Sequence, residues 1–200
     1  MNASLESYLK GYNDPRIKSY FNLAQDGRDK EGNIIKEVAG VKQLNSIEGE
    51  YKGVRQGTGV ADNRYSTHSQ TAITTGSKII VMSAAEVWFL RAEAALRNYT
   101  SENVENCYKQ GITVSFAQWD ASGVSEYLES EETPTAYVDA FDKKFDADAP
   151  TSITPKWDES APLELKLERI ITQKWLAIYP EGCEAWAVSY THLRAHETRS

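Results

Sequence analysis

Residues 82–97 read MSAAEVWFLRAEAALR, and this stretch decides the fold. Ser83 followed three positions later by Glu86 is a capping box, in which each side chain satisfies the other residue's backbone amide. Glu93 and Arg97 stand four residues apart with the acid first, a spacing that supports a helix. The pattern therefore predicts a helix that begins directly after Ser83.

The apolar side chains of this helix cover a wide arc. They fall in two rows, Val87, Leu90 and Ala94 and then Ala84, Trp88, Ala92 and Ala95. A helix that is apolar over so wide an arc is mostly buried. We expect it to lie inside a stack of helices, where alanines let backbones approach and the Trp88 or Phe89 ring fills the gaps.

A second helix is predicted over about 102–119, with Ser101 as its candidate cap. Its inward side chains recur every three or four residues: Val104, Tyr108, Ile112, Ser115 and Trp119. Because the connection NYTS (98–101) is so short, the two helices are expected to be antiparallel neighbours.

Two more helices are predicted on either side of a polar loop at 146–160. Thr133-Pro134 is a start signal, and aromatic residues recur every four positions after it, at Tyr137, Phe141 and Phe145. Pro162 opens the last long helix, whose inward stripe is Leu163, Leu167, Ile171, Trp175 and Ile178. Pro180 ends that helix near Tyr179, and EGCEAWA (181–187) begins another short one.

The first 77 residues hold nine of the twelve glycines, a density typical of turns. We expect loops and short strands with one helix near the start, lying over a helical scaffold and carrying the binding residues. SKIIVM (77–82) is interpreted as a short buried extended segment. The fold class is therefore mainly α, with a loop-rich region at 1–77 and helical hairpins at 78–187.

Composition excludes several classes of protein. The 200 residues carry a net charge of −7 with both signs interspersed, whereas a nucleic-acid surface needs a basic patch. No run approaches the ~18 apolar residues of a membrane span. MNASLESYLK (1–10) is no signal peptide, so the sequence is either cytoplasmic or a fragment whose export signal is missing.

Catalytic and metal motifs are absent from the sequence. There is no GxSxG, HExxH or Walker loop, and nothing places any of the three histidines (His68, His192 and His196) beside a nucleophile. Asp142, Asp146 and Asp148 could hold Ca²⁺, but their spacing fails the EF-hand pattern, and solvated loop acids are the favoured interpretation. No cofactor and no metal site are predicted.

The two cysteines, Cys107 and Cys183, form no metal-ligand cluster and no CxxC pair. We interpret both as buried small hydrophobic residues, and a disulfide between them stays open. Three loop aromatics, Tyr51, Tyr65 and Trp157, lie outside the helical stripes. They could offer flat faces to sugars, or they could pin the loops to the scaffold.

Five stretches together resemble the C-terminal part of a SusD/RagB-family protein. They are MNASLESYLKGYNDPR (1–16), YKGVRQG (51–57), MSAAEVWFLRAEAAL (82–96), YKQGITVSFAQW (108–119) and ITQKWLAIYPEGCEAW (171–186). The resemblance implies an outward-facing outer-membrane lipoprotein that binds glycans or other nutrients without catalysis. It also implies a helical scaffold of tetratricopeptide-type hairpins and a partner, a SusC-like TonB-dependent transporter on which the protein sits as a lid.

The sequence departs from the family's pattern in two places. The signal peptide, the lipidated cysteine and the N-terminal half are absent, which suggests a fragment that starts at an internal methionine. After Trp186 the chain reads AVSYTHLRAHETRS (187–200), and we expect residues 188–200 to be a non-native tail.

If the chain is part of such a lid, ligand contact should fall on the glycine-rich region after NDPR (13–16). Stacking and planar donors suit sugars, so Tyr51, Arg55 and Tyr65 are the candidate ligand-binding residues. The alternative function is an intracellular helical-repeat adaptor that binds peptides. A hydrolase is a third hypothesis, and it depends only on the loop carboxylates.

Overall fold

The computed structural model describes residues 1–60, 63–77 and 80–188, which divide into two compact units. Unit 1 consists of Met1–Gly76 and Glu132–Ser152, and unit 2 of Ser77–Glu131 and the chain from Ile153 onward. Segment 132–152, which the sequence pattern assigns to the helical scaffold, thus belongs with the N-terminal residues.

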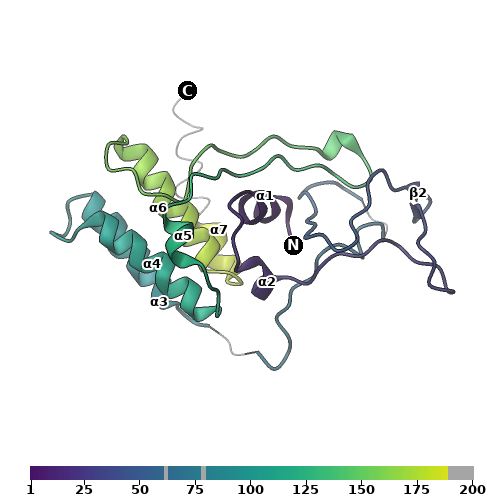
Figure 1. Ribbon diagram of the computed structural model, residues 1–200, viewed down its shortest axis with the longest axis horizontal. Coiled ribbons are helices and arrows are strands. Elements are labelled where there is room, and N and C mark those ends of the chain that lie inside the picture. Colours follow the sequence, from purple (N-terminus) through teal and green to yellow (C-terminus); the bar gives the residue numbers. More distant parts are fainter. Residues whose placement is uncertain (61–62, 78–79, 189–200) are drawn as a thin grey trace. The chain divides into compact units, whose positions relative to one another are not determined.

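Unit 2 is a helical assembly built on three mutually contacting helices (Figure 1). These are α3 (Ala84–Leu96), α4 (Val104–Gln118) and α6 (Leu163–Ala177). The short α5 (Val124–Leu128), which the sequence did not predict, contacts α4, and α7 (Gly182–Val188) contacts α6. The four helices predicted for this part of the chain are confirmed.

Helix α3 begins as its capping residue predicts. Ser83 Oγ accepts a hydrogen bond from the Glu86 amide at 3.0 Å, and Arg97 pairs with Glu93 at 3.0 Å. The predicted apolar rows are wrong in part, because Val87 and Leu90 are about 40% exposed. The buried face of the helix is formed by Ala85, Phe89, Ala92 and Ala95.

Phe89, and not Trp88, fills the gap between the paired helices. Its fully buried ring packs edge-on against Tyr108 of α4, with 6.2 Å between ring centroids. A Cβ added to Gly111 would lie 2.7 Å from two atoms of the Phe89 ring, so this crossing needs a glycine. The partner of the alanine-rich helix is therefore α4, as the short connection predicts.

Helices α4 and α6 differ from their predictions in detail. Asn103, and not Ser101, caps α4 by accepting from the Asn106 amide at 2.8 Å. The predicted stripe of α4 is buried at Tyr108, Ile112 and Ser115 and half-buried at Val104 and Trp119.

In α6, Ile171 and Ile178 are buried, and Leu167 and Trp175 pack against them, as the stripe predicts. Leu163 is 49% exposed, which is a correction at the first turn. Ile170 and Leu176 lie off the stripe, yet both are fully buried. The second half of α6 is therefore surrounded on more than one face.

The helix predicted after Thr133-Pro134 is wrong. Tyr137 forms an antiparallel bridge with Ala147, and the only helical turn here is the 3₁₀ helix η1 (Lys143–Phe145). Tyr137, Asp139 and Phe141 are buried at a spacing of two residues, which suits an extended chain, and Ala140 between the last two is buried as well. A repeat of four residues fits an extended chain of period two as well as a helix, so the aromatic spacing could not separate them.

The buried extended segment predicted at 77–82 is also wrong in its described part. Residues 81 and 82 form a bend, with Val81 90% and Met82 56% exposed.

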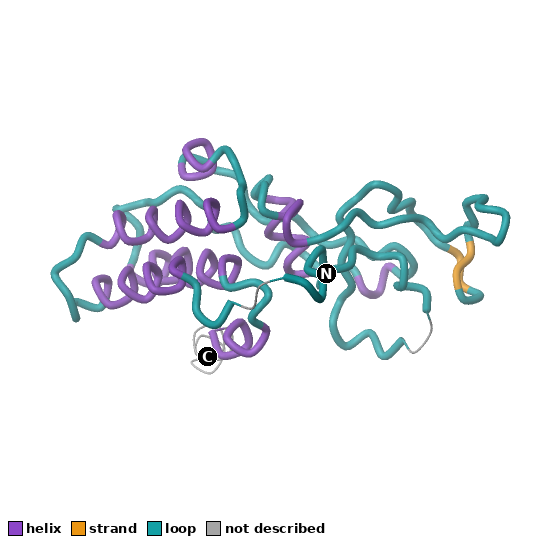
Figure 2. Tube along the Cα trace, turned by 90° about the horizontal axis from the view of Figure 1, so that it is seen from below, coloured by secondary structure: helices purple, strands orange, loops and turns teal. Residues whose placement is uncertain are grey.

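Unit 1 contains little regular structure, as the density of glycines predicts (Figure 2). It has α1 (Ala3–Gly11), a short α2 (Ile17–Tyr20) and a two-stranded hairpin of β1 (Glu37–Val38) and β2 (Val41–Lys42). Ala39 and Gly40 turn the hairpin with φ of 51° and 73°, the positive values that a type I′ turn requires.

Unit 1 nevertheless has a buried apolar cluster of its own. Ala24 and Ile47 pack with Ala140 and Phe141 of segment 132–152, and Tyr65 lies against this group. The cluster therefore packs the glycine-rich residues against segment 132–152.

Gly111→Ala should lower the free energy of unfolding by about 1–3 kcal/mol, because the new methyl group overpacks the buried Phe89 ring. The better helix propensity of alanine offsets this by only ~1 kcal/mol. Gln110→Ala on the exposed face of α4 is the matched control and should change stability by less than about 0.5 kcal/mol. Urea unfolding measures both, and equal stability of the two variants would show that the crossing tolerates a side chain.

Candidate ligand-binding surface

A buried ion pair fixes the segment that carries Tyr51 and Arg55 to the first helix. Glu6 of α1 accepts from the Lys52 ammonium at 2.9 Å and from the Gly53 amide at 2.7 Å. A Cβ at Gly53 would lie 2.4 Å from the backbone oxygen of residue 2, so the close approach requires glycine. Both charged side chains are at most 10% exposed, which strengthens the pair and makes the loss of either partner costly.

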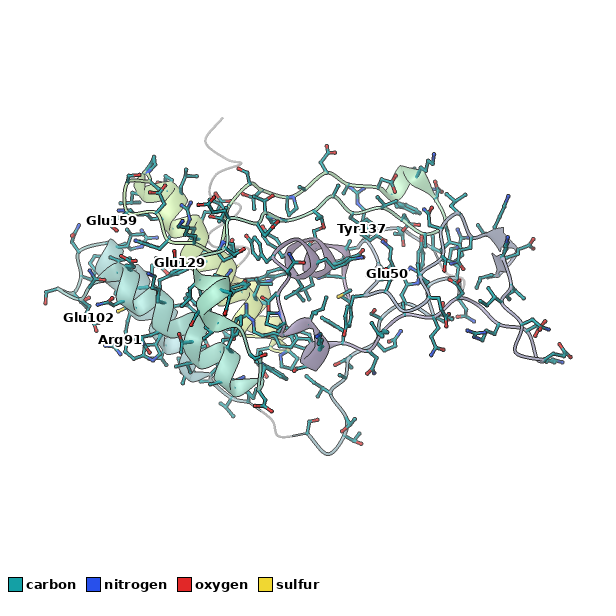
Figure 3. All side chains as sticks on the ribbon, in the orientation of Figure 1. Glu50, Arg91, Glu102, Glu129, Tyr137 and Glu159 are labelled. Atoms are coloured by element: carbon teal, nitrogen blue, oxygen red, sulfur yellow. The ribbon has the colours of Figure 1, made fainter. Side chains whose placement is uncertain are left out.

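Asp139 is the second buried charge, and it lies on a segment that we name the strap (residues 132–152). The residue is 0% exposed, and its carboxylate accepts from the Tyr137 hydroxyl at 2.9 Å and from the Tyr65 hydroxyl at 3.3 Å. The amides of Phe141 and Asp142 donate to the same carboxylate at 2.9 and 3.0 Å. Tyr137 is labelled in Figure 3.

Burial, together with the charge of Asp139, raises the pKa of both Tyr65 and Tyr137 well above the usual range for tyrosine. Both phenols therefore keep their protons and act as donors to Asp139. These contacts satisfy a carboxylate that would otherwise be strongly destabilising in the interior.

The strap closes on itself around Asp139. The backbone amide and carbonyl of Tyr137 pair with those of Ala147 at 2.8 and 3.0 Å, and the Asp139 amide donates to the Asp146 carboxylate at 2.7 Å. Asp142 caps the turn by accepting from the Lys144 amide at 3.0 Å. The loop between residues 139 and 146 is thereby held at both ends.

Two of the three predicted ligand-binding residues contact this strap. Tyr65 is half-buried, and besides its bond to Asp139 its ring stands edge-on to Phe141 at 5.5 Å. Arg55 is exposed, and its Nη1 donates to the backbone carbonyls of residues 145 and 146 at 3.3 and 2.8 Å. Tyr51 is half-buried, and burial raises the pKa of its phenol.

Trp157, the remaining loop aromatic, has a structural role in unit 2. It is 7% exposed, its indole donates to Glu159 at 2.8 Å and its ring lies 5.1 Å from that of Tyr108. For this residue the interpretation as a loop tether is confirmed.

The sequence did not single out Glu6, Lys52 or Asp139. The sequence around these residues gives no sign that they are buried, because their partners are distant in the chain. Lys52 pairs with Glu6, 46 residues away, and Asp139 pairs with Tyr65, 74 residues away. The one local signal was the alternation of Tyr137, Asp139 and Phe141, which places all three on one side of an extended chain.

Two of the three acidic residues weighed as a cation site have other partners. Asp142 pairs with Lys144 at 2.7 Å, and Asp146 accepts from the Asp139 amide. Within the described ranges, no group of three or more potential metal ligands is found.

Both cysteines are free thiols. Cys107 is buried as predicted, whereas the prediction is wrong for Cys183, which is exposed on α7. His192, His196 and the predicted non-native tail lie outside the described residues, apart from residue 188 itself.

This chain belongs to the SusD-like family, described as SusD and RagB outer membrane lipoproteins, because the family model matches residues 1–190. A chitin-binding SusD homologue from Flavobacterium johnsoniae is 38% identical with a TM-score of 0.80, over 94% of this chain and 36% of that one. A SusD homologue from Bacteroides vulgatus is 39% identical with a TM-score of 0.78 over the same shares. The predicted mainly α, tetratricopeptide-like fold is confirmed.

A SusD homologue from Bacteroides thetaiotaomicron is 32% identical with a TM-score of 0.79, over 94% of this chain and 37% of that one. The chain thus spans a little over a third of the length of these relatives. It matches no curated protein. In the part of the chain that the structure describes, none of the helices combines the length and apolar character needed to cross a bilayer.

His68 should make unit 1 sensitive to acid. The ring is 2% exposed and stacked on Phe141, and neither nitrogen has a hydrogen-bond partner among the described residues. Burial, helped by the charge of Lys52, lowers the pKa of His68 to about 4 from its usual 6.5. Between these values the unfolded chain binds more protons, so the free energy of unfolding should fall by about 3 kcal/mol as pH drops through this window.

His68→Phe keeps a ring beside Phe141 and removes the titration. The stability difference between wild type and variant, measured by urea unfolding at about pH 7 and about pH 4.5, should therefore shift in favour of the variant at the lower pH. An identical pH dependence for the two proteins would show that the histidine is not held neutral.

Proposed function

We propose that this chain is part of a cell-surface protein of the outer membrane that binds glycan and delivers it to a SusC-like TonB-dependent transporter, without catalysing a reaction itself. The observation that carries the proposal is membership of an outer-membrane lipoprotein family, joined to 38% identity with a relative described as chitin-binding. The same membership weighs against the alternative of an intracellular adaptor that binds peptides.

We assign the ligand contacts to Tyr51, Arg55 and Tyr65 in unit 1. An arginine presents a planar fork of donors that suits the hydroxyls and amides of a sugar, and tyrosine rings offer faces for stacking. The contacts of Arg55 and Tyr65 with the strap favour this role, because side chains that are already ordered lose less entropy when a ligand binds. The same contacts also fit a purely structural role, and the two roles differ in measurable ways.

Alanine substitution of Tyr51, Arg55 or Tyr65 should weaken glycan binding by about tenfold each, the equivalent of roughly 1.4 kcal/mol. Binding is measured by calorimetry with chitin hexasaccharide and with fragments of other polysaccharides, and melting temperature is measured in parallel. Tyr99→Ala, at a position 78% exposed in unit 2, is the control and should change neither quantity.

Weakened binding with unchanged melting supports the assignment, whereas lower melting with unchanged affinity would reduce these residues to loop tethers. The non-enzymatic part of the proposal has a test of its own. Release of new reducing ends from any of the polysaccharides by the purified protein would overturn it.

A further inference from the structure

Two candidate ligand-binding residues that lie ten positions apart share one distant support. The hydroxyl of Tyr65 bonds to the strap 74 residues downstream, and the guanidinium of Arg55 bonds to it 90 and 91 residues downstream. Both contacts fall on the closed loop between Asp139 and Asp146. The strap therefore links Tyr65 and Arg55 to each other indirectly.

The linkage passes through Asp139 and Asp146. Tyr65 bonds to the side chain of Asp139, and the backbone amide of Asp139 bonds to the side chain of Asp146 at 2.7 Å. The carbonyl oxygen of Asp146 in turn accepts from Arg55 at 2.8 Å. A change at Asp139 should thus reach both candidate residues along a continuous series of hydrogen bonds.

We propose that Asp139 is a positioning residue for the ligand-binding surface, setting the orientation of Tyr65 directly and of Arg55 through Asp146. This inference rests on the function proposed above. Asp139 itself is 0% exposed and acts only through the residues it holds. Ligand specificity in this unit would then depend on the buried strap as well as on the exposed side chains.

Asp139 has enough donors for the roles to be separated by mutation. Its carboxylate receives four hydrogen bonds, two from phenols and two from backbone amides. Removing the Tyr65 hydroxyl leaves the other three, so Tyr65→Phe should free the ring without unfolding the strap. Tyr137→Phe is the matched control, because it removes a hydroxyl donor to the Asp139 carboxylate without changing a candidate ligand-binding residue.

Chitin hexasaccharide binding, melting temperature and hydrogen exchange are measured for Tyr65→Phe, Tyr137→Phe, Asp139→Asn and the double variant of Tyr65 and Asp139. Tyr65→Phe should weaken binding roughly three- to tenfold, the scale on which a typical intramolecular hydrogen bond contributes. Tyr137→Phe should lower melting, since its hydroxyl also donates to the Gly53 carbonyl at 3.0 Å, but should leave affinity near that of the wild type.

The loss of affinity in the double variant should be smaller than the sum of the two single losses, because both changes act on the same contact. Additive losses in affinity would overturn the proposal, as would losses that simply follow melting temperature across all the variants. Should Asp139→Asn fail to fold, the contrast between Tyr65→Phe and Tyr137→Phe decides the matter.

Hydrogen exchange separates this inference from the proposed function. Faster exchange in residues 63–70 of Tyr65→Phe, and in residues 51–57 and 63–70 of Asp139→Asn, supports positioning even if the wild type binds no glycan. Absence of glycan binding by the wild type would defeat the proposed function alone. Unchanged exchange at these segments in both variants would defeat the positioning role, whatever the protein binds.

Discussion

The buried carboxylate of Asp139 is the constraint on which the loop-rich unit depends. A charge that is 0% exposed is tolerated only where donors replace the water that it has lost. Two of its four donors are backbone amides of the strap. The other two are the hydroxyls of Tyr137 in the strap and of Tyr65 on a distant loop. Satisfying this one group therefore fixes the position of the strap against the loop that carries Tyr65.

The ion pair of Glu6 and Lys52 at the first helix is a second case in which buried charges are satisfied by partners within the protein. Lys52 also donates to the Val138 carbonyl at 2.5 Å, so the pair is joined to the strap. The described part of unit 1 has little regular structure, and such contacts take the place of regular backbone ladders. The apolar cluster around Phe141 is small, and these buried polar contacts join the loops around it to one another.

The two units are ordered by different kinds of contact. Unit 2 packs helices α3 and α4 closely through an alanine-rich face and a glycine crossing. Unit 1 carries the candidate binding residues on loops whose order comes from buried charges. Loops ordered in this manner can change their exposed residues while the buried partners stay.

Features that depend on near neighbours could be predicted from the sequence. The cap at Ser83, the end of α6 before Pro180 and the glycine-rich turns all follow from residues a few positions apart, and the family resemblance follows from short stretches read in order. Features that depend on distant partners could not be predicted in this way, because the chain has to fold before those partners meet. The spacing of Tyr137, Phe141 and Phe145 fits a helix and a strand equally, and the strap is extended because Tyr137 pairs with Ala147 and Asp139 finds its donors there. The buried face of α3 was likewise set by the position of Gly111 on another helix, since periodicity gives the width of an apolar face but not the partner that covers it.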